Sequence, residues 1–86
     1  MKTRRNTTVR FAICVDNAEY PASLELHRVY RVLPDRDAQR DGDLRVVDES
    51  GEDYLFPASR FILLPLPRRT AETLRKSYPR SLQQVV

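Results

Sequence analysis

The sequence of 86 residues has no tryptophan, one cysteine, one histidine and two glycines. Two glycines are too few for a glycine-rich loop that cradles phosphate. Cys14 has no second cysteine in the chain with which to form a disulfide, which suits a reducing compartment, and we expect a cytoplasmic protein. A zinc site needs about four Cys, His or carboxylate ligands, and Cys14 and His27 are the only soft ones. We therefore expect neither a metal nor another cofactor.

Long hydrophobic runs are also missing. The longest wholly apolar stretch, FILLPLP from Phe61 to Pro67, is far shorter than the roughly 20 residues that cross a bilayer. The basic N-terminus is followed by an apolar run of only Phe11 to Val15, which Asp16 ends without a small-residue cleavage pattern. We expect neither a signal peptide nor a contact with the membrane.

Charge is divided unevenly along the chain, although the net charge is only +3. Residues 1–10 carry four basic side chains and no acid, and residues 57–86 carry six basic side chains against Glu72. Residues 34–56 carry eight acids against three arginines. Basic ends and an acidic middle favour a dipolar surface over a uniformly cationic one.

Several segments have the pattern of β-strands. Val9, Phe11, Ile13 and Val15 alternate with other residues at the period of two that a half-buried strand requires. SLELHRVYRVL is rich in the β-branched and aromatic residues that favour strands. LRVVDESGEDYLF predicts a hairpin that turns over residues 49–52, where Gly51 is free to adopt a positive φ. A last strand is predicted over 61–64.

The remaining segments predict loops and one helix. PDRDAQRDGD, residues 34–43, predicts an exposed, hairpin-like loop because of its proline, glycine and charges. PRRTAETLRKSY predicts a short C-terminal helix with a cap at or near Thr70, with Ala71, Leu74 and Tyr78 at helical spacing. We expect Pro79 to end this helix.

Five short strands with no helix between them predict a mainly β protein, a small antiparallel barrel closed by a C-terminal helix. We divide the chain into a flexible basic arm (1–8), a barrel (9–66) and a C-terminal helix and tail (67–86). The predicted core consists of Phe11, Ile13, Leu24, Tyr30, Val32, Val46, Leu55 and Phe61.

Two segments resemble the SH3-like barrels. LELHRVYRVL is similar to the turn and second strand of that family, which implies inward-facing Leu24, Tyr30 and Val32 and a turn at His27. YLFPASRFI is similar to its ending, in which a strand meets a proline, makes one 3₁₀ turn and continues as a short final strand. The resemblance implies a five-stranded SH3-like antiparallel barrel whose corner runs from Pro57 to Arg60.

The departures from the family bear on function. SH3 domains that bind polyproline present an aromatic groove, with a tryptophan that this chain lacks and a tyrosine where it has Arg60. The acidic, tyrosine-containing segment of such domains is only partly matched by DNAEYP. We therefore do not expect recognition of proline motifs. The chain is similar to small bacterial SH3-like proteins whose partners do not follow from their fold.

Residue types that act as catalysts or metal ligands in other proteins have structural explanations in this chain. Cys14 and His27 are interpreted as a small strand residue and a turn residue, not as a nucleophile and its base. Asp35, Asp37, Asp41 and Asp43 lack the glycine and terminal glutamate of a calcium loop, so a solvated loop is predicted. We expect a protein that is not an enzyme.

Two kinds of binding remain. Protein binding is favoured, because FILLPLP is unusually apolar for an edge strand and forms an interaction patch unless Leu74 and Tyr78 of the helix cover it. The alternative is nucleic-acid binding by the basic arm, through Arg4, Arg5 and Arg10, and by the helix, with Tyr30 among the tyrosines that could stack on bases. The candidate binding residues are Tyr20, Tyr54, Arg60, Arg68, Arg69, Arg75 and Lys76. Neither the protein partner nor the oligomeric state is predicted.

Overall fold

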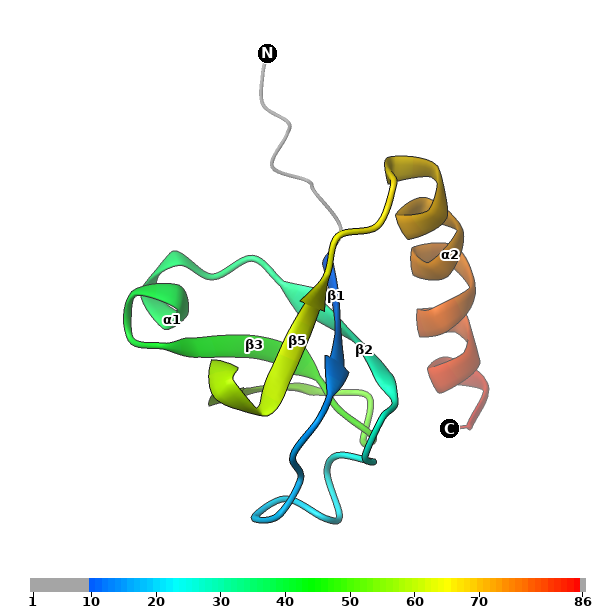
Figure 1. The fold of residues 1–86 in the computed structure, drawn as a ribbon. Coiled ribbons are helices and arrows are strands. Elements are labelled where there is room, and N and C mark those ends of the chain that lie inside the picture. The colour runs from blue at the N-terminus through cyan, green and yellow to red at the C-terminus, as the bar shows by residue number, and fades with distance from the viewer. Residues whose placement is uncertain (1–9, 86) are drawn as a thin grey trace.

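The computed structural model describes residues 10–85, with side chains described for residues 10–77. Within this range five strands form one antiparallel sheet in the order β4-β3-β2-β1-β5 (Figure 1). Their bounds are β1 (Arg10–Cys14), β2 (Val29–Leu33), β3 (Asp43–Val47), β4 (Asp53–Pro57) and β5 (Phe61–Leu64). The prediction of a mainly β fold with five antiparallel strands and a C-terminal helix is confirmed.

The sheet curls because its two edge strands are neighbours in the sequence. Only the 3₁₀ turn η2 (Ala58–Arg60) separates β4 from β5, although they lie at opposite ends of the strand order. The corner is held by two backbone hydrogen bonds, from Ala58 N to Gly42 O at 2.9 Å and from Val15 N to Arg60 O at 2.8 Å. No β4–β5 pairing occurs among the described residues, so the sheet is curled but is not closed into a barrel.

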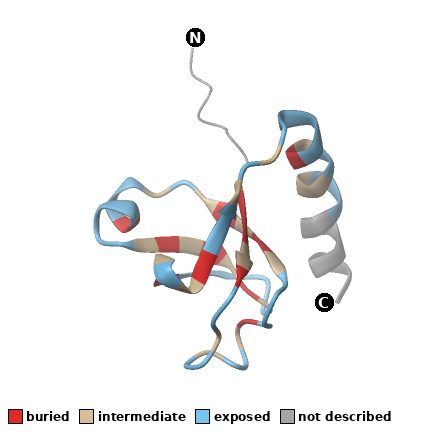
Figure 2. Ribbon diagram, in the orientation of Figure 1, coloured by how far each residue is buried: buried red, intermediate tan, exposed pale blue. Residues whose placement is uncertain are grey.

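The core lies on the inner face of the curled sheet (Figure 2). Phe56 of β4 and Phe61 of β5 meet across the corner with ring centroids 6.2 Å apart, and Tyr20 packs edge-on against Phe56 at 5.1 Å. The buried cluster consists of Ala12, Cys14, Leu24, Tyr30, Val32, Leu44, Val46, Phe56 and Phe61. Burial of the turn residue Leu24, as the resemblance implied, shows that the loop after β1 also contributes to the core.

The predicted core is correct for six residues and wrong for two. Phe11, Leu24, Tyr30, Val32, Val46 and Phe61 are buried. Ile13 is only half-buried and Leu55 is exposed. The buried residues Ala12, Cys14, Leu44 and Phe56 were not predicted.

The face of β1 was misassigned because β1 lies inside the sheet, between β2 and β5. Ala12 is opposite Tyr30 and Leu63, and it shares the inner face with Tyr30. Phe11 therefore faces the other side, where it is 1% exposed but does not belong to the main cluster. Alternation cannot identify the core side of a strand whose two faces are both covered.

The error at Leu55 is one of register in β4. The hairpin turn fixes the pairing through a bond from Asp48 N to Glu52 O at 3.0 Å, and this register places Phe56 opposite Leu44 and Leu55 opposite Arg45. Leu44 is a core residue, so Phe56 enters the core and Leu55 faces away from it. Because positions 54–56 are all apolar, the sequence does not show whether Leu55 or Phe56 faces the core.

The segment 34–43 is not the hairpin-like loop that was predicted, because it contains a short helix, α1 (Arg36–Arg40). Asp35 caps this helix by accepting a hydrogen bond from Ala38 N at 2.9 Å, and Ala38 is buried. Gly42 then leaves the helix with a φ of 81°, a conformation that glycine adopts without steric cost. The aspartate that suggested a solvated loop is thus a helix cap.

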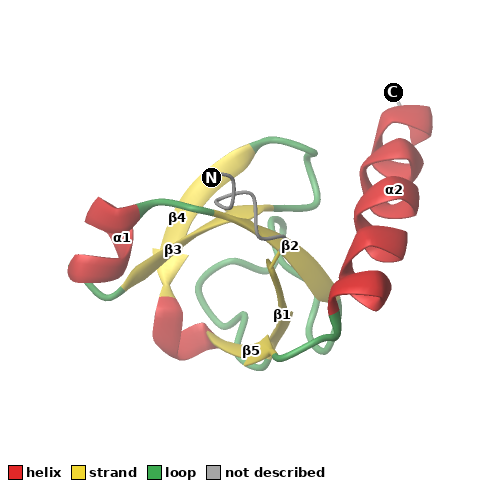
Figure 3. Ribbon diagram, turned by 90° about the horizontal axis from the view of Figure 1, so that it is seen from above, coloured by secondary structure: helices red, strands yellow, loops and turns green. Residues whose placement is uncertain are grey.

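The C-terminal helix α2 (Arg68–Val85) is longer than predicted. It begins with a bond from Ala71 N to Pro67 O at 2.9 Å, so Thr70 lies in its first turn and is not its cap. The helix also continues past Pro79, where the missing N–H removes one bond of the ladder without ending it. In Figure 3 the helix lies beside the outer face of β1 and β2. Neither described helix has the length and apolar content to cross a membrane.

Two predictions fall on parts of the chain that lie outside the described residues. The basic arm, residues 1–8, is one of them. The packing of the Tyr78 side chain is the other. The predicted boundary between barrel and helix, at 66 and 67, lies one residue from the observed start of α2 at Arg68.

The turn before β2 places His27 in a left-handed conformation. Arg28 N bonds to Glu25 O at 3.2 Å to close the turn, and His27 has a φ of 68°. His27 N also bonds to Cys14 O at 2.7 Å, which ties the turn to β1. A side chain at this φ costs free energy that glycine avoids.

We predict that Phe61→Ala lowers the free energy of unfolding by about 3 kcal/mol, because it leaves a cavity beside Phe56. Ile62→Ala is the matched control in the same strand, and its exposed side chain leads us to expect a loss several times smaller. Urea unfolding measures both. A loss below about 1 kcal/mol for Phe61→Ala would contradict the buried corner.

We predict that His27→Gly raises the free energy of unfolding by about 0.5 kcal/mol, since relief of the left-handed strain exceeds the added entropy of the unfolded chain. His27→Val is expected to lower it by about 1 kcal/mol or more, because a β-branched side chain fits this φ worst. Thermal and urea unfolding give both values. An equal loss for the two variants would show that the imidazole itself stabilises the turn.

Candidate functional site

Exposed apolar side chains gather on the edge strand β5. Ile62 is 56% exposed and Leu63 is 42% exposed, and the segment after β1 adds Val15 at 38%. Ile62 is opposite Ile13 and shares its face of the sheet with Val15, whereas Leu63 is opposite Ala12. Helix α2 thus leaves Ile62 and Leu63 open, so the alternative in which the helix covers Leu63 is wrong.

The backbone of β5 is also open on the side away from β1. The bond from Val15 N to Arg60 O marks residues 15 and 60 as a hydrogen-bonded pair. Because such pairs alternate along an antiparallel ladder, Ile62 and Leu64 bond toward β1 and Leu63 directs its N–H and C=O outward. Leu63 therefore has an open donor and acceptor among the described residues. We call this side of 61–64, with its side chains Ile62 and Leu63, the β5 edge.

Strand β4 forms the opposite edge of the sheet and is exposed as well. Tyr54 is 49% and Leu55 46% exposed. The bond from Asp48 N to Glu52 O sets the alternation here, so Asp53 and Leu55 direct their backbone groups away from β3. We call this side of 53–57, with its side chains Tyr54 and Leu55, the β4 edge.

Acidic side chains surround the start of the β4 edge. The Tyr54 hydroxyl donates to Glu52 Oε1 at 2.9 Å, and this bond to a carboxylate raises the pKa of Tyr54. Asp53 accepts from Arg45 Nη1 at 3.1 Å, while Arg45 Nε bonds to Asp35 Oδ2 at 2.7 Å. Arg45 thus links β4 to the cap of α1 and neutralises part of the local negative charge.

Asp35 is the most strongly held of these carboxylates. Its pKa is lowered first by the N–H of Ala38, which it caps, and then by Arg45. The pKa of Arg45 is raised by Asp35 and Asp53 in return. This arrangement fixes the segment between β2 and β3 against the back of the β4 edge.

Tyr20 and Arg60, two predicted binding residues, lie together at the corner. The guanidinium of Arg60 pairs with Asp16 and Glu19, at 2.8 Å each, and lies 5.7 Å from the centroid of the Tyr20 ring. Its side chain is only 17% exposed. Arg60 therefore holds the loop after β1 to the corner, and its charge is already matched by two acids.

The basic residues of α2 whose side chains are described differ in their contacts. Arg75 pairs with Glu72 at 2.9 Å. Arg68 and Arg69, at the start of the helix, are exposed and form no ion pair with any residue that the structure describes. Lys76 is exposed on the following turns. Of the predicted cationic sites, Arg68 and Arg69 are therefore the most accessible to a partner.

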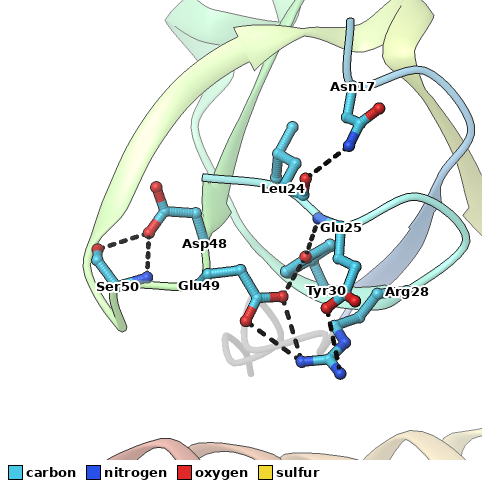
Figure 4. Close-up of polar contacts among 8 residues, drawn as sticks. All are labelled: Asn17, Leu24, Glu25, Arg28, Tyr30, Asp48, Glu49 and Ser50. Atoms are coloured by element: carbon cyan, nitrogen blue, oxygen red, sulfur yellow. Dashed lines mark hydrogen bonds and ion pairs between the residues drawn. The ribbon is translucent and has the colours of Figure 1, made fainter. Parts of the chain in front are cut away.

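A polar network joins the loop before β2 to the β3–β4 turn (Figure 4). The Tyr30 hydroxyl donates to the Glu49 carboxylate and accepts from Glu25 N at 2.7 Å. Arg28 completes the network with Glu49 at 3.2 Å and Glu25 at 3.4 Å. Because the Tyr30 ring is fully buried, its predicted ability to stack on bases is ruled out.

Two further contacts stiffen the same loops. Asn17 Nδ2 donates to Leu24 O at 2.9 Å, and the buried Asp48 accepts from Ser50 N at 2.9 Å and from Ser50 Oγ at 2.6 Å (Figure 4). We assign the whole network to structure, because its side chains bond to one another and to the backbone of the loops that they join.

Cys14 and His27 occupy the structural positions expected of them. The Cys14 side chain is fully buried in the core, and His27 lies in its turn. Among the described residues, no three His, Cys, Asp or Glu side chains are grouped so as to hold a metal ion.

Comparison with known proteins adds no family assignment. No protein-family model matches the chain, and no curated protein or solved structure matches it either.

We predict that Asp35→Asn lowers stability at pH 7 but not at low pH. The folded-state pKa of Asp35 lies below 3.8, so its ionised form stabilises the fold above that value, and the gain is lost as pH falls through the folded pKa. The difference in urea midpoint between wild type and variant should shrink below about pH 4 and disappear in stronger acid.

Asp35→Ala is the matched second variant for this experiment. Asparagine preserves the helix cap and loses only the charge, whereas alanine loses both. We expect Asp35→Ala to remain less stable than wild type even in acid. A difference for Asp35→Asn that is constant from pH 7 to the acid limit would disprove the role of the charge.

Proposed function

We propose that the protein is a non-enzymatic SH3-like binding module that binds another protein by strand addition along the β5 edge. The observation that carries this proposal is the coincidence of an open backbone edge at Leu63 with exposed apolar side chains at Ile62 and Leu63. An added strand gains main-chain hydrogen bonds from such an edge and specificity from the alternating side chains. An apolar edge strand left bare would promote aggregation, which favours a partner that covers it.

The SH3-like part of the proposal is supported by the strand order and the corner. The 3₁₀ turn between β4 and the short final strand β5 agrees with what YLFPASRFI implied, and β4 and β5 lie at the two ends of the strand order. A fold of this kind hosts many functions, so the proposal rests on the edge and not on the fold. The lone Cys14 supports a cytoplasmic location for the module.

Nucleic-acid binding is the second candidate, and one observation favours it. Arg68 and Arg69 are exposed and have no acidic partner among the described residues, so they are available to phosphates. Arg60 and Arg75 are paired with acids and Tyr30 is buried, so fewer groups serve this function than the sequence suggested. The balance favours protein binding.

We predict that the double variant Ile62→Lys, Leu63→Lys loses the protein partners that wild type retains. The exposed positions allow lysine without a loss of core packing, and lysine on an edge opposes strand addition. The measurement is affinity capture from the source cells by wild type and by this variant, with partners identified by mass spectrometry. Unfolding curves confirm that both proteins are folded.

The control variant for nucleic-acid binding is Arg68→Glu, Arg69→Glu, because these exposed arginines have no acidic partner among the described residues. Nucleic-acid binding predicts that labelled DNA or RNA binds at low salt, weakens steeply as salt rises and is lost in this control variant. Identical partners for wild type and the double lysine variant would refute protein binding through β5.

A further inference from the structure

We propose that the partner of the β5 edge is the β4 edge of a second copy of this chain, added as an antiparallel strand. The inference rests on the proposed function, because it names the occupant of the same edge. Both edges belong to one chain and are exposed in it, and they do not pair with each other among the described residues. Each copy therefore offers the two halves of one contact.

The open backbone groups of the two edges match in the antiparallel direction. Leu63 offers an N–H and a C=O on the β5 edge, and Leu55 offers the same pair on the β4 edge. Placing Leu63 opposite Leu55 lets each bond to the other, which is the hydrogen-bonded pair of an antiparallel ladder. In this register Asp53 lies opposite Pro65, which follows the end of β5 at Leu64. Pro57 and Pro65 have no backbone N–H, and both lie at the ends of the contact.

Charge selects the antiparallel direction over the parallel one. Glu52 and Asp53 lie at the start of β4, and Arg68 and Arg69 follow the end of β5. Antiparallel addition brings this acidic end beside the two exposed arginines. Parallel addition would bring it to the corner, where Asp16 and Glu19 already carry negative charge. Like charges there would oppose the contact.

The exposed side chains also match in size and kind. Leu63 is 42% exposed and Leu55 is 46% exposed, so their pairing covers two apolar side chains that are each half open in the single chain. In the same register Tyr54 is opposite Leu64, which is half-buried. The contact is therefore apolar in its centre and charged at one end, as protein interfaces commonly are.

The test uses the full chain and two proline variants, Leu63→Pro and Leu55→Pro. In both cases the lost N–H faces outward, so proline blocks the added strand without removing a bond of the native ladder. Sedimentation velocity measures mass from about 10 µM to about 1 mM protein at low salt. We expect wild type to exceed the monomer mass of 10.0 kDa as concentration rises, and each variant to stay monomeric.

Mixing the two variants gives the decisive measurement. Leu63→Pro retains an intact β4 edge and Leu55→Pro retains an intact β5 edge, so the mixture should form a 1:1 dimer that neither variant forms alone. If circular dichroism shows that a proline variant is unfolded, Leu63→Lys and Leu55→Lys replace the pair. A mixture of folded variants that stays monomeric would overturn the inference, as would self-association of either variant alone.

Charge reversal tests the direction of the added strand. Arg68→Glu, Arg69→Glu should weaken self-association at least about tenfold at low salt. Arg75→Glu, Lys76→Glu makes the same change in net charge further along α2 and should weaken it much less. Equal effects of the two double variants would overturn the antiparallel register.

Failure of this inference can be distinguished from failure of the proposed function. A wild-type protein that is monomeric over the whole concentration range overturns the inference alone, provided that the double lysine variant at Ile62 and Leu63 still loses captured proteins. Loss of no partner by that variant overturns the proposed function itself. If the wild type is monomeric and the double lysine variant still loses captured proteins, the β5 edge binds an extended segment of a different protein.

Discussion

The fold depends on one constraint, which is that the chain passes from one edge of its sheet to the other in three residues. Pro57 leads out of β4, Ala58–Arg60 make a single 3₁₀ turn, and Phe61 returns to the core. A flat sheet of five strands cannot be spanned by so short a connection, so the sheet must curl. The contact between Phe56 and Phe61 fills the angle of that curl and makes the corner part of the core.

Most of the charge near the corner and the loops is used inside the molecule. Arg60 binds Asp16 and Glu19, Arg45 binds Asp35 and Asp53, and Arg28 binds Glu25 and Glu49. Exposed ion pairs contribute little stability each, but they fix loops that lack regular hydrogen bonding. A chain with 31% charged residues thus presents fewer free charges than its composition suggests.

The curl also leaves two strand edges without a neighbouring strand among the described residues. The strands approach each other at the corner, but the described residues show no pairing between β4 and β5, so both edges keep unused backbone groups. Exposed apolar residues accompany each edge, and opposite charges flank them. A protein partner that supplies a strand would bond to the unused backbone groups of such an edge and would cover its exposed apolar side chains. A nucleic acid would use only the arginines at the start of α2.

Local patterns in the chain were sufficient to locate the five strands and the hairpin at Gly51, because turn chemistry and strand propensity act over a few residues. The turn at His27 and the corner at Pro57 were implied by the resemblance to SH3-like barrels. The helix α1 was missed because it has only five residues, of which Ala38 alone is buried, so it shows no apolar periodicity. Which faces of β1 and β4 enter the core was decided by tertiary pairing, since apolar residues lie on both faces of each strand and only the neighbouring strands distinguish them. The candidate site was foreseen at FILLPLP and at Arg68 and Arg69, whereas the engagement of Arg60 and the exposure of Leu55 follow from long-range contacts that no local pattern encodes.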